Sequence, residues 1–212
     1  MQSPYIIGIT GGSGSGKTAF LNGLMKSFSP EDICLISQDN YYKPIEEQQI
    51  DENGIHNFDI PQSINASLYA QHILDLKNGK TVTQKEYTFN NPEIIPKDIT
   101  LHPAPIIVVE GIFVFHFSEI DSLLNFKIFI ETKEHLKIKR RIIRDNIERG
   151  YDLNDVLYRY EFHAAPSFQK FIEPYKDLSD LIIPNNQNFE NALEVLCVFL
   201  KEKIKNAKPN SI

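Results

Sequence analysis

The sequence predicts a single α/β domain built on a mainly parallel sheet of about five strands, with helices on both faces. Short, fully apolar segments alternate with stretches of helical periodicity, which is typical of strands that are buried on both sides. A glycine-rich segment separates the first apolar run from the first helical stretch. The 212 residues suffice for one such domain with a substantial core. We therefore expect one domain over residues 1–205 and a flexible tail over 206–212.

The expected strands are short runs rich in isoleucine, valine and phenylalanine. In chain order they span Tyr5–Thr10, Ile33–Ser37, Ile106–Val109, Phe126–Ile130 and Leu181–Ile183. The expected helices span Lys17–Phe28, Ile64–Asn78, Lys133–Arg149, Leu153–Ala164 and Asn191–Lys205. For the second helix, Ser63 is the expected N-cap and Gly79 the stop. Residues of about 80–101 mix short β-type runs with turn residues, which indicates a hairpin insertion.

Composition and charge exclude several classes of function. The net charge of −6 should keep the surface as a whole from attracting nucleic acid or anionic membranes. No apolar run is long enough to span a membrane, and the N-terminal segment lacks the charged region of a secretory signal. Cys34 and Cys197 lie in apolar runs and are expected to be reduced, buried thiols. The histidines lack paired-ligand spacing, which argues against zinc. These features favour a cytoplasmic protein.

The glycine-rich segment matches G-x-x-x-x-G-K-[ST], the pattern of a phosphate-binding loop or P-loop. It consists of Gly11, Gly12, Ser13, Gly14, Ser15, Gly16, Lys17 and Thr18. Glycines let the main chain wrap around phosphate oxygens, and N–H groups at a helix N-terminus supply positive potential. Lys17 can reach the β and γ phosphates, and the Thr18 hydroxyl can ligate Mg²⁺. A flexible glycine–serine turn is the alternative, but the pattern should arise by chance in only roughly one chain in a hundred. We therefore expect a doubly wound P-loop NTPase fold.

The P-loop alone does not distinguish kinases, GTPases and ATPases. A GTPase should carry a guanine-reading Asn-Lys-x-Asp, and the sequence has none. Asp51-Glu52-Asn53-Gly54 matches the Asp-x-x-Gly pattern, but the residues before it are polar and not strand-like. A surface turn is therefore the preferred interpretation of that segment.

Two carboxylates at strand ends favour a kinase. Asp39 lies just beyond the second predicted strand, and Glu110 closes the third. Ligands of open α/β sheets bind outside the carboxyl ends of the strands. Asp39 can accept a proton from a hydroxyl group or hold a metal-bound water, and Glu110 can partner Mg²⁺ directly or through water. The alternative for either residue is an N-cap or turn position.

The expected helix over 133–149 is cationic within an acidic protein. It carries Lys133, Lys137, Lys139, Arg140, Arg141, Arg144 and Arg149. Phosphoryl transfer needs positive charges that neutralise the migrating phosphate, and a closing lid can supply them. The alternative is a solvated helix face whose cations pair with Glu134, Asp145 and Glu148.

Several stretches resemble a known family in their order along the chain. They are Gly8–Thr18, Ser37–Tyr42, Asn57–Asp59, Val109–Ile112, Arg140–Asp145, Glu148–Gly150 and Phe171–Pro174. On these residues the chain resembles uridine/cytidine kinases, within the wider group that includes phosphoribulokinase. The resemblance covers roughly residues 6–200. It implies transfer of a phosphoryl group from ATP, with GTP as an alternative donor, to the 5′-hydroxyl of a ribonucleoside such as uridine or cytidine.

The resemblance also implies roles for individual residues. Asp39 corresponds to the catalytic base, with Lys17 and Arg144 as the catalytic cations. Tyr42 corresponds to a residue of the nucleoside pocket, and Asp59 to the carboxylate that binds ribose hydroxyls with Arg141 as its partner. The further correspondences are Tyr87 and Phe89 with an aromatic pair against the base, and Arg149 with a lid arginine that contacts phosphates. Independently of the resemblance, Thr18, Glu110 and Asp39 are the candidates for the surroundings of Mg²⁺. Family members are often homo-oligomers.

Some positions depart from the family pattern. Pro92 stands where the family has a histidine that reads the pyrimidine, Tyr151 replaces an arginine, and Arg159 replaces a glutamine. Asn185-Asn186-Gln187 replaces a basic-glycine turn. Two alternatives therefore stay open: a kinase for another sugar-like or vitamin-like alcohol, and a nucleotide-binding regulatory protein with little turnover.

Overall fold

The centre of the molecule is one parallel β-sheet. The computed structural model describes residues 3–88, 94–148 and 150–207. The sheet has the strand order β2-β5-β1-β6-β7. Its strands are β1 (Tyr5–Thr10), β2 (Ile33–Ser37), β5 (Ile106–Glu110), β6 (Phe126–Glu131) and β7 (Leu181–Pro184). Each expected strand is present within a residue of its predicted bounds, and the α/β class with five parallel strands is confirmed.

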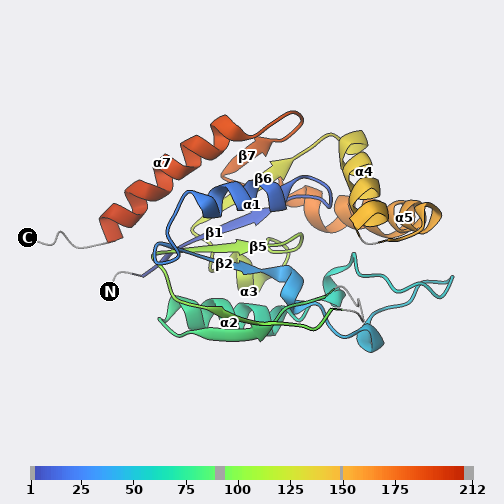
Figure 1. The fold of residues 1–212 in the computed structure, drawn as a ribbon, viewed down its shortest axis with the longest axis horizontal. Helices are drawn as coiled ribbons and strands as arrows, with labels where there is room; N and C mark the ends of the chain where they lie inside the picture. The colour runs from blue at the N-terminus through green and yellow to red at the C-terminus, as the bar shows by residue number, and fades with distance from the viewer. Residues whose placement is uncertain (1–2, 89–93, 149, 208–212) are drawn as a thin grey trace, which may run out of the picture.

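Helices cover both faces of the sheet (Figure 1). Their bounds are α1 Lys17–Lys26, α2 Ala66–Lys77, α3 Ser118–Asp121, α4 Glu134–Ile143, α5 Leu153–Arg159, α6 Ala165–Ser167 and α7 Glu190–Ala207. On one face, Ile7 and Ile9 of β1 pack with Phe20 of α1 and Leu200 of α7. On the other face, Ile6 lies in one cluster with Tyr69 of α2 and Ile120 of α3. Because alternate residues of a strand point to opposite faces, β1 contributes to both cores.

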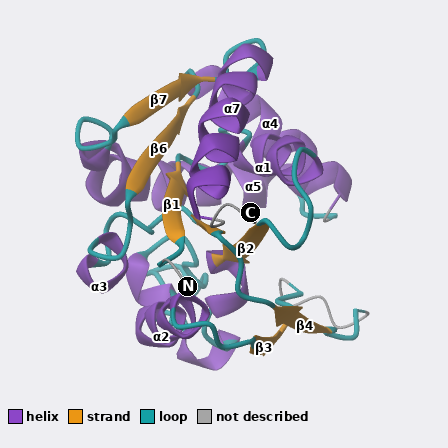
Figure 2. Cartoon of the chain, turned by 90° about the vertical axis from the view of Figure 1, so that its left-hand side faces the viewer, coloured by secondary structure: helices purple, strands orange, loops and turns teal. Residues whose placement is uncertain are grey.

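The predicted insertion is a two-stranded antiparallel hairpin that is separate from the main sheet (Figure 2). It consists of β3 (Val82–Lys85) and β4 (Asp98–Leu101). Val82 is buried and joins the core on the α2 side of the sheet, which anchors the hairpin to the domain. Phe89 and Pro92, in the connection between the two strands, lie outside the described residues.

Several helix boundaries differ from their predictions. The first helix ends at Lys26 rather than Phe28, and the helix expected over Leu153–Ala164 is α-helical only to Arg159 and continues as a π-helix over Tyr160–Ala164. The N-cap of α2 is Asn65, whose side-chain oxygen accepts a hydrogen bond from the Leu68 N–H, so the assignment of the cap to Ser63 was wrong. Ser63 is a buried residue of a 3₁₀ turn, and its hydroxyl donates to the Asn57 carbonyl. The basic helix is α-helical only to Ile143 and continues as a π-helix over Arg144–Glu148. At the other end of the chain, α7 extends to Ala207, two residues into the expected tail.

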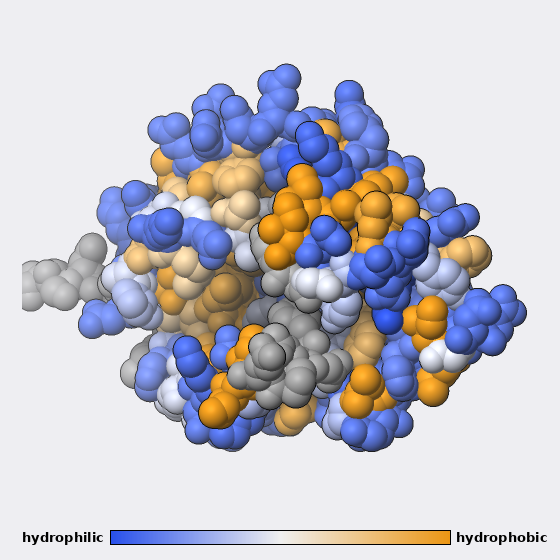
Figure 3. Space-filling view, turned by 45° about the vertical axis from the view of Figure 1, so that its right-hand side comes forward, coloured by the Kyte–Doolittle hydropathy of each residue, from blue (hydrophilic) through white to orange (hydrophobic). Residues whose placement is uncertain are grey.

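We call the described part of residues 134–164, which holds α4, α5 and the π-helical turns after them, the α4–α5 region. It lies beyond the carboxyl ends of the strands, opposite the end where β1 begins and α7 ends (Figure 1). Apolar side chains are scattered among hydrophilic ones on its outer surface (Figure 3). The exposed members are Ile143, Ile147, Leu153, Leu157 and Phe162. Within the described ranges, no helix is long and apolar enough to cross a membrane.

Candidate functional site

Three neighbouring strands end side by side at the sheet edge that faces α4 and α5. The P-loop follows β1, Asp39 follows β2, and Glu110 is the last residue of β5, which lies between these two strands. In the strand register, Glu110 pairs with Ile9 of β1 on one side and with Ser37 of β2 on the other. The strand order therefore brings together three groups that are far apart in the sequence.

The P-loop has the left-handed conformations that its glycines allow. Gly14 and Gly16 have φ angles of 78° and 90°. A side chain at Gly14 would also collide with the main chain of α4, because an added Cβ would lie 2.4 Å from the Lys137 carbonyl oxygen. Gly16 is the N-cap of α1, so the loop leads directly into the helix N-terminus. These positions can only be glycine without strain, as a loop wrapped closely around phosphate requires.

A set of donors that the sequence did not reveal fixes the Ser15 carbonyl on the outside of the loop. The Asn185 amide donates to this oxygen at 2.8 Å and the Thr132 hydroxyl at 2.9 Å, with Arg140 Nη1 at 3.4 Å. Because a trans peptide is planar, the N–H of the next residue must point the opposite way. This brace therefore orients the Gly16 N–H away from the three donors.

Lys17 and Glu110 are both buried, and their charges interact. Both side chains are 8% exposed. Lys17 Nζ donates to the Gly11 and Gly12 carbonyls at 2.8 and 3.4 Å, and the Ser37 hydroxyl donates to Glu110 Oε2 at 2.9 Å. Burial lowers the pKa of Lys17, and Glu110 and Asp39 oppose that shift. Burial, with Asp39 nearby, raises the pKa of Glu110 to about 7.

Asp39 is held in place by the residues around it. It lies in a 3₁₀ turn over Gln38–Tyr41, and its N–H donates to the Ser37 hydroxyl. The Gln38 side chain is buried, and its oxygen accepts from the Phe113 N–H at 2.9 Å. A Cβ at Gly111 would lie 2.0 Å from that oxygen, so glycine after Glu110 lets this turn pack against the end of β5. The turn is therefore anchored to a core strand.

One cleft of about 720 Å³ connects the P-loop with the opposite wall. At one end it is lined by Ser13, Gly14, Gly16, Lys17 and Thr18, and farther along by Asp39, Tyr42, Asp59, Tyr87, Glu110, Arg141 and Arg144. The other P-loop residues, Gly11, Gly12 and Ser15, are buried behind this lining. The structure thus brings together the predicted site residues that it describes. Phe89 and Arg149 lie outside the described residues.

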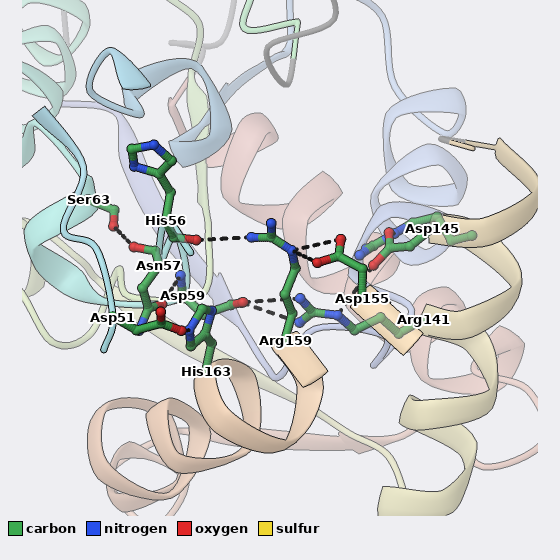
Figure 4. A network of polar contacts seen from close by, with 11 residues as sticks. Asp51, His56, Asn57, Asp59, Ser63, Arg141, Asp145, Asp155, Arg159 and His163 are labelled. Atoms are coloured by element: carbon green, nitrogen blue, oxygen red, sulfur yellow. Dashed lines mark hydrogen bonds and ion pairs between the residues drawn. The ribbon is translucent and has the colours of Figure 1, made fainter. Parts of the chain in front are cut away.

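A chain of charges crosses the cleft wall from Asp59 to the basic helix (Figure 4). Arg141 donates to both Asp59 oxygens, at 3.3 and 3.1 Å, and forms an ion pair with Asp145 at 3.3 Å. Arg144 Nε donates to the same Asp145 at 2.8 Å. Arg141 is 8% exposed, so it is not part of a solvated helix face. The two-pronged contact with Arg141 fixes the Asp59 carboxylate in orientation.

Aromatic rings form the wall next to Asp39. The ring centroids of Tyr42 and Tyr87 are 5.1 Å apart, and Phe58 lies edge-on to Tyr42 at 6.0 Å. The Tyr87 N–H donates to the Asn40 side chain at 3.0 Å, which ties the hairpin insertion to the turn that carries Asp39. Flat, partly apolar surfaces of this kind suit a planar ring in the ligand.

The residues that depart from the family pattern have separate locations. Tyr151 and Arg159 line the cleft, whereas Pro92 is outside the described residues. Arg159 Nε donates to both oxygens of Asp155 at 3.0 Å. Asn185 directs its amide into the P-loop brace, so its role in this structure is to support the loop.

The Asp-x-x-Gly segment is a turn, as its polar flanking residues predict. The Gly54 N–H donates to the Asp51 carbonyl, and the Asp51 side chain accepts from the N–H groups of Asn53 and Ile55. It does not line the cleft.

Comparison with known sequences gives one consistent result. A model of the phosphoribulokinase/uridine kinase family matches residues 6–191. The uridine kinase of Macrococcus caseolyticus is 37% identical over 205 residues, which cover 97% of this chain and all of that protein. Uridine-cytidine kinase B of Dictyostelium discoideum is 32% identical over 203 residues, which cover 96% of this chain and 84% of that protein.

Solved structures with low identity share the fold. The D-glycerate 3-kinase of Cryptococcus neoformans has a TM-score of 0.59 at 12% identity and covers 87% of both chains. A protein named as a possible uridine kinase from Bacillus stearothermophilus has a TM-score of 0.57 at 16% identity, covering 86% of this chain and 89% of that one.

Substitution of Asn185 by alanine tests the P-loop brace. The variant loses the shortest hydrogen bond to the Ser15 carbonyl, so the loop should hold its peptide orientation less firmly. We expect the affinity for ATP to fall roughly five-fold, the equivalent of about 1 kcal/mol. Isothermal titration calorimetry measures this. Asn186→Ala is the matched control, because its side chain instead accepts from the Lys133 N–H. Equal losses in both variants would contradict the brace.

Substitution of Glu110 by glutamine tests the buried charge. Because the folded-state pKa of about 7 exceeds the ordinary value of 4.5, folding favours the protonated carboxyl. Stability from this group is therefore present below about pH 4.5 and is lost as the pH rises through about 7. Glutamine cannot ionise, so the variant should unfold at least ~2 °C above the wild type near pH 8 and gain little near pH 5. Calorimetry without nucleotide gives both values, and a pH-independent difference would refute the assignment.

Proposed function

The chain belongs to the phosphoribulokinase/uridine kinase family and is a phosphotransferase, and we propose that it phosphorylates the 5′-hydroxyl of a ribonucleoside with ATP as donor. Uridine and cytidine are the acceptors we propose, as the names of its relatives suggest. The observation that carries this proposal is the single cleft with a P-loop at one end and Asp39, the aromatic wall and the Asp59–Arg141 pair at the other.

The donor end suits ATP with Mg²⁺. The Thr18 hydroxyl and the Glu110 carboxylate line the cleft, and such oxygens are the ligands that Mg²⁺ prefers. A cation would also compensate the charge of ionised Glu110, whose pKa is raised by burial and then by the nearby Asp39 carboxylate. Among the described residues, no three His, Cys, Asp or Glu side chains converge on one point, so phosphate oxygens and water would complete the shell. Bound there, Mg²⁺ would neutralise charge on the phosphates.

The chemistry at the acceptor end requires a base and positioned cations. In the proposed reaction, Asp39 accepts the proton of the 5′-hydroxyl while the oxygen of that hydroxyl forms a bond to the γ-phosphorus of ATP. The bond from the γ-phosphorus to ADP breaks, and ADP leaves. Lys17 and Arg144 both line the cleft and would stabilise the negative charge of the transferred group. Lys17 would exchange the Gly11 carbonyl for phosphate oxygens when the nucleotide binds. Most of the rate enhancement then comes from positioning and charge stabilisation.

The acceptor wall suits a ribose attached to a flat base. The Asp59 carboxylate can accept two hydroxyl hydrogen bonds, and Arg141 holds it in one orientation. The rings of Tyr42, Tyr87 and Phe58 offer flat surfaces for a base. Thr18, Asp39 and Glu110 complete the proposed surroundings of the metal and the reacting oxygen.

A second candidate acceptor keeps the reaction and changes the alcohol. Tyr151 and Arg159 line the cleft at positions where the family pattern has other residues. A site that lacks a hydrogen-bond partner for a base discriminates weakly, while new polar groups select new ligands. A sugar-like or vitamin-like alcohol is therefore the alternative acceptor. A regulatory protein with little turnover does not need Asp39 beside the P-loop.

An acceptor panel decides between these candidates. The purified protein is incubated with ATP, Mg²⁺ and one of uridine, cytidine, other ribonucleosides or non-nucleoside alcohols, and ADP formation is measured. We expect uridine or cytidine to give the highest kcat/KM. If both nucleosides are inert while another alcohol reacts, the nucleoside assignment is wrong. If nothing reacts, the regulatory alternative gains support.

Asp39→Asn tests the proposed base. Asparagine has a similar shape but cannot accept the hydroxyl proton, so kcat should fall by a factor on the order of 10² or more. ATP affinity, measured by calorimetry, should stay within about two-fold because the P-loop is unchanged. Turnover equal to that of the wild type would remove Asp39 from this role.

A further inference from the structure

One wall of the cleft is a segment with little regular structure. Residues 43–59 contain a 3₁₀ turn over Ile45–Glu47 and the isolated bridge between Ile50 and His56, but no strand of the main sheet. The segment nevertheless contributes His56, Phe58 and Asp59 to the cleft. Apart from main-chain hydrogen bonds such as that from the Lys43 N–H to the Ser63 carbonyl, side-chain contacts hold it in position.

Polar links at three places join this segment to the α4–α5 region (Figure 4), and Asn53 Nδ2 adds a hydrogen bond to the Tyr158 hydroxyl at the third. Asp59 binds Arg141, and the His56 carbonyl accepts from Arg159 Nη1 at 2.9 Å. The third link is at Asp51, where Oδ2 accepts from the Tyr158 hydroxyl and lies 2.8 Å from His163 Nε2. The first two links lie in the cleft, while the third lies outside its lining.

The side chains of the third link are largely buried, and both oxygens of the Asp51 carboxylate accept hydrogen bonds. The His163 side chain is 2% exposed and that of Asp51 is 17% exposed. The other Asp51 oxygen accepts from the N–H groups of Asn53 and Ile55 at 2.9 Å. Burial opposes ionisation of Asp51, but the hydrogen bonds outweigh it and hold its pKa well below the ordinary value. An acceptor with four donors is costly to replace, because an unpaired donor would remain buried.

The α4–α5 region has few apolar contacts that could fix it in place. The buried residues of α4 are Lys137 and Arg141, and the one buried residue of α5 is Val156. Several of its large apolar side chains, such as Leu153, Leu157 and Phe162, are exposed, and Leu136, Ile138 and Ile142 are only half-buried. Polar links to residues 43–59 must therefore supply much of the restraint between the two parts.

We propose that Asp51, Tyr158 and His163 form a latch that fixes the acceptor wall against α5 and the π-helical turn that follows it. The three are positioning residues, because they hold Asp59 and His56 in register with Arg141 and Arg159 without lining the cleft. The latch therefore governs binding of the acceptor and leaves the donor end unaffected. This inference rests on the proposed function, because it takes the cleft wall beside Asp59 as the part of the cleft that binds the acceptor.

The test compares two substitutions at His163. His163→Leu removes the donor to Asp51, and His163→Gln keeps an N–H donor near the position of Nε2. We expect His163→Leu to raise KM for the nucleoside about ten-fold with KM for ATP within two-fold, and His163→Gln to restore most of the loss. His116→Leu is the matched control, since His116 also pairs with a tyrosine, Tyr175, but lies away from the cleft. It should leave both KM values unchanged.

Hydrogen exchange supplies a readout that needs no substrate. In His163→Leu, the amides of residues 45–58 should exchange at least several-fold faster than in the wild type, and in His163→Gln they should not. Unchanged exchange, or equal changes of both KM values, would overturn the latch. Wild-type protein that is inert toward every nucleoside would instead refute the proposed function, and the exchange experiment would still decide whether the latch exists.

Discussion

The burial of Lys17 beside Glu110 and Asp39 is the constraint on which the site depends. Burial disfavours the charged form of Lys17, and the carboxylates of Glu110 and Asp39 offset part of that effect because the strand order places β5 between β1 and β2. Burial, and after it the nearby Asp39 carboxylate, disfavour the ionised form of Glu110 and raise its pKa. The carboxyl end of the sheet therefore holds buried positive and negative charges that a bound polyphosphate and a cation can balance. Without these ligands, the buried charges lower the stability of the folded protein.

Much of the surrounding structure keeps these charges in place. The Tyr69 hydroxyl, reaching from α2, lies 3.0 Å from the carbonyl oxygens of both Ile36 and Glu110, and so links the ends of β2 and β5. Asn185, just after β7, and Thr132, just before α4, donate to the Ser15 carbonyl and so hold the P-loop in position. The far wall is held differently, by side-chain links between an irregular segment and helices with little apolar anchoring. The donor end is thus built on the core, and the acceptor end on polar contacts, which suits a wall that must admit and release a substrate.

The sequence predicted those parts of the site whose cause is local. The P-loop is a contiguous motif, and the positions of Asp39 and Glu110 follow from strand ends. The pairing of Asp59 with Arg141, 82 residues apart, was available only from family resemblance. The brace by Asn185 escaped prediction because it binds a main-chain carbonyl and so leaves no side-chain pattern. The cap of α2 was misassigned because two capping residues, Ser63 and Asn65, lie two positions apart and tertiary contacts decide between them. Asp51 was correctly expected in a turn, but its contact with His163, 112 residues away, has no local signal.

The central claim is that one cleft holds the phosphate donor at the P-loop and the acceptor hydroxyl at Asp39. A crystal structure with a non-hydrolysable ATP analogue, Mg²⁺ and the preferred acceptor measures this directly. The account predicts that Lys17 Nζ leaves the Gly11 carbonyl for the phosphates, and that an Asp39 oxygen lies within about 3.2 Å of the acceptor hydroxyl. An acceptor hydroxyl bound away from Asp39, with its ribose not in contact with Asp59, would contradict it.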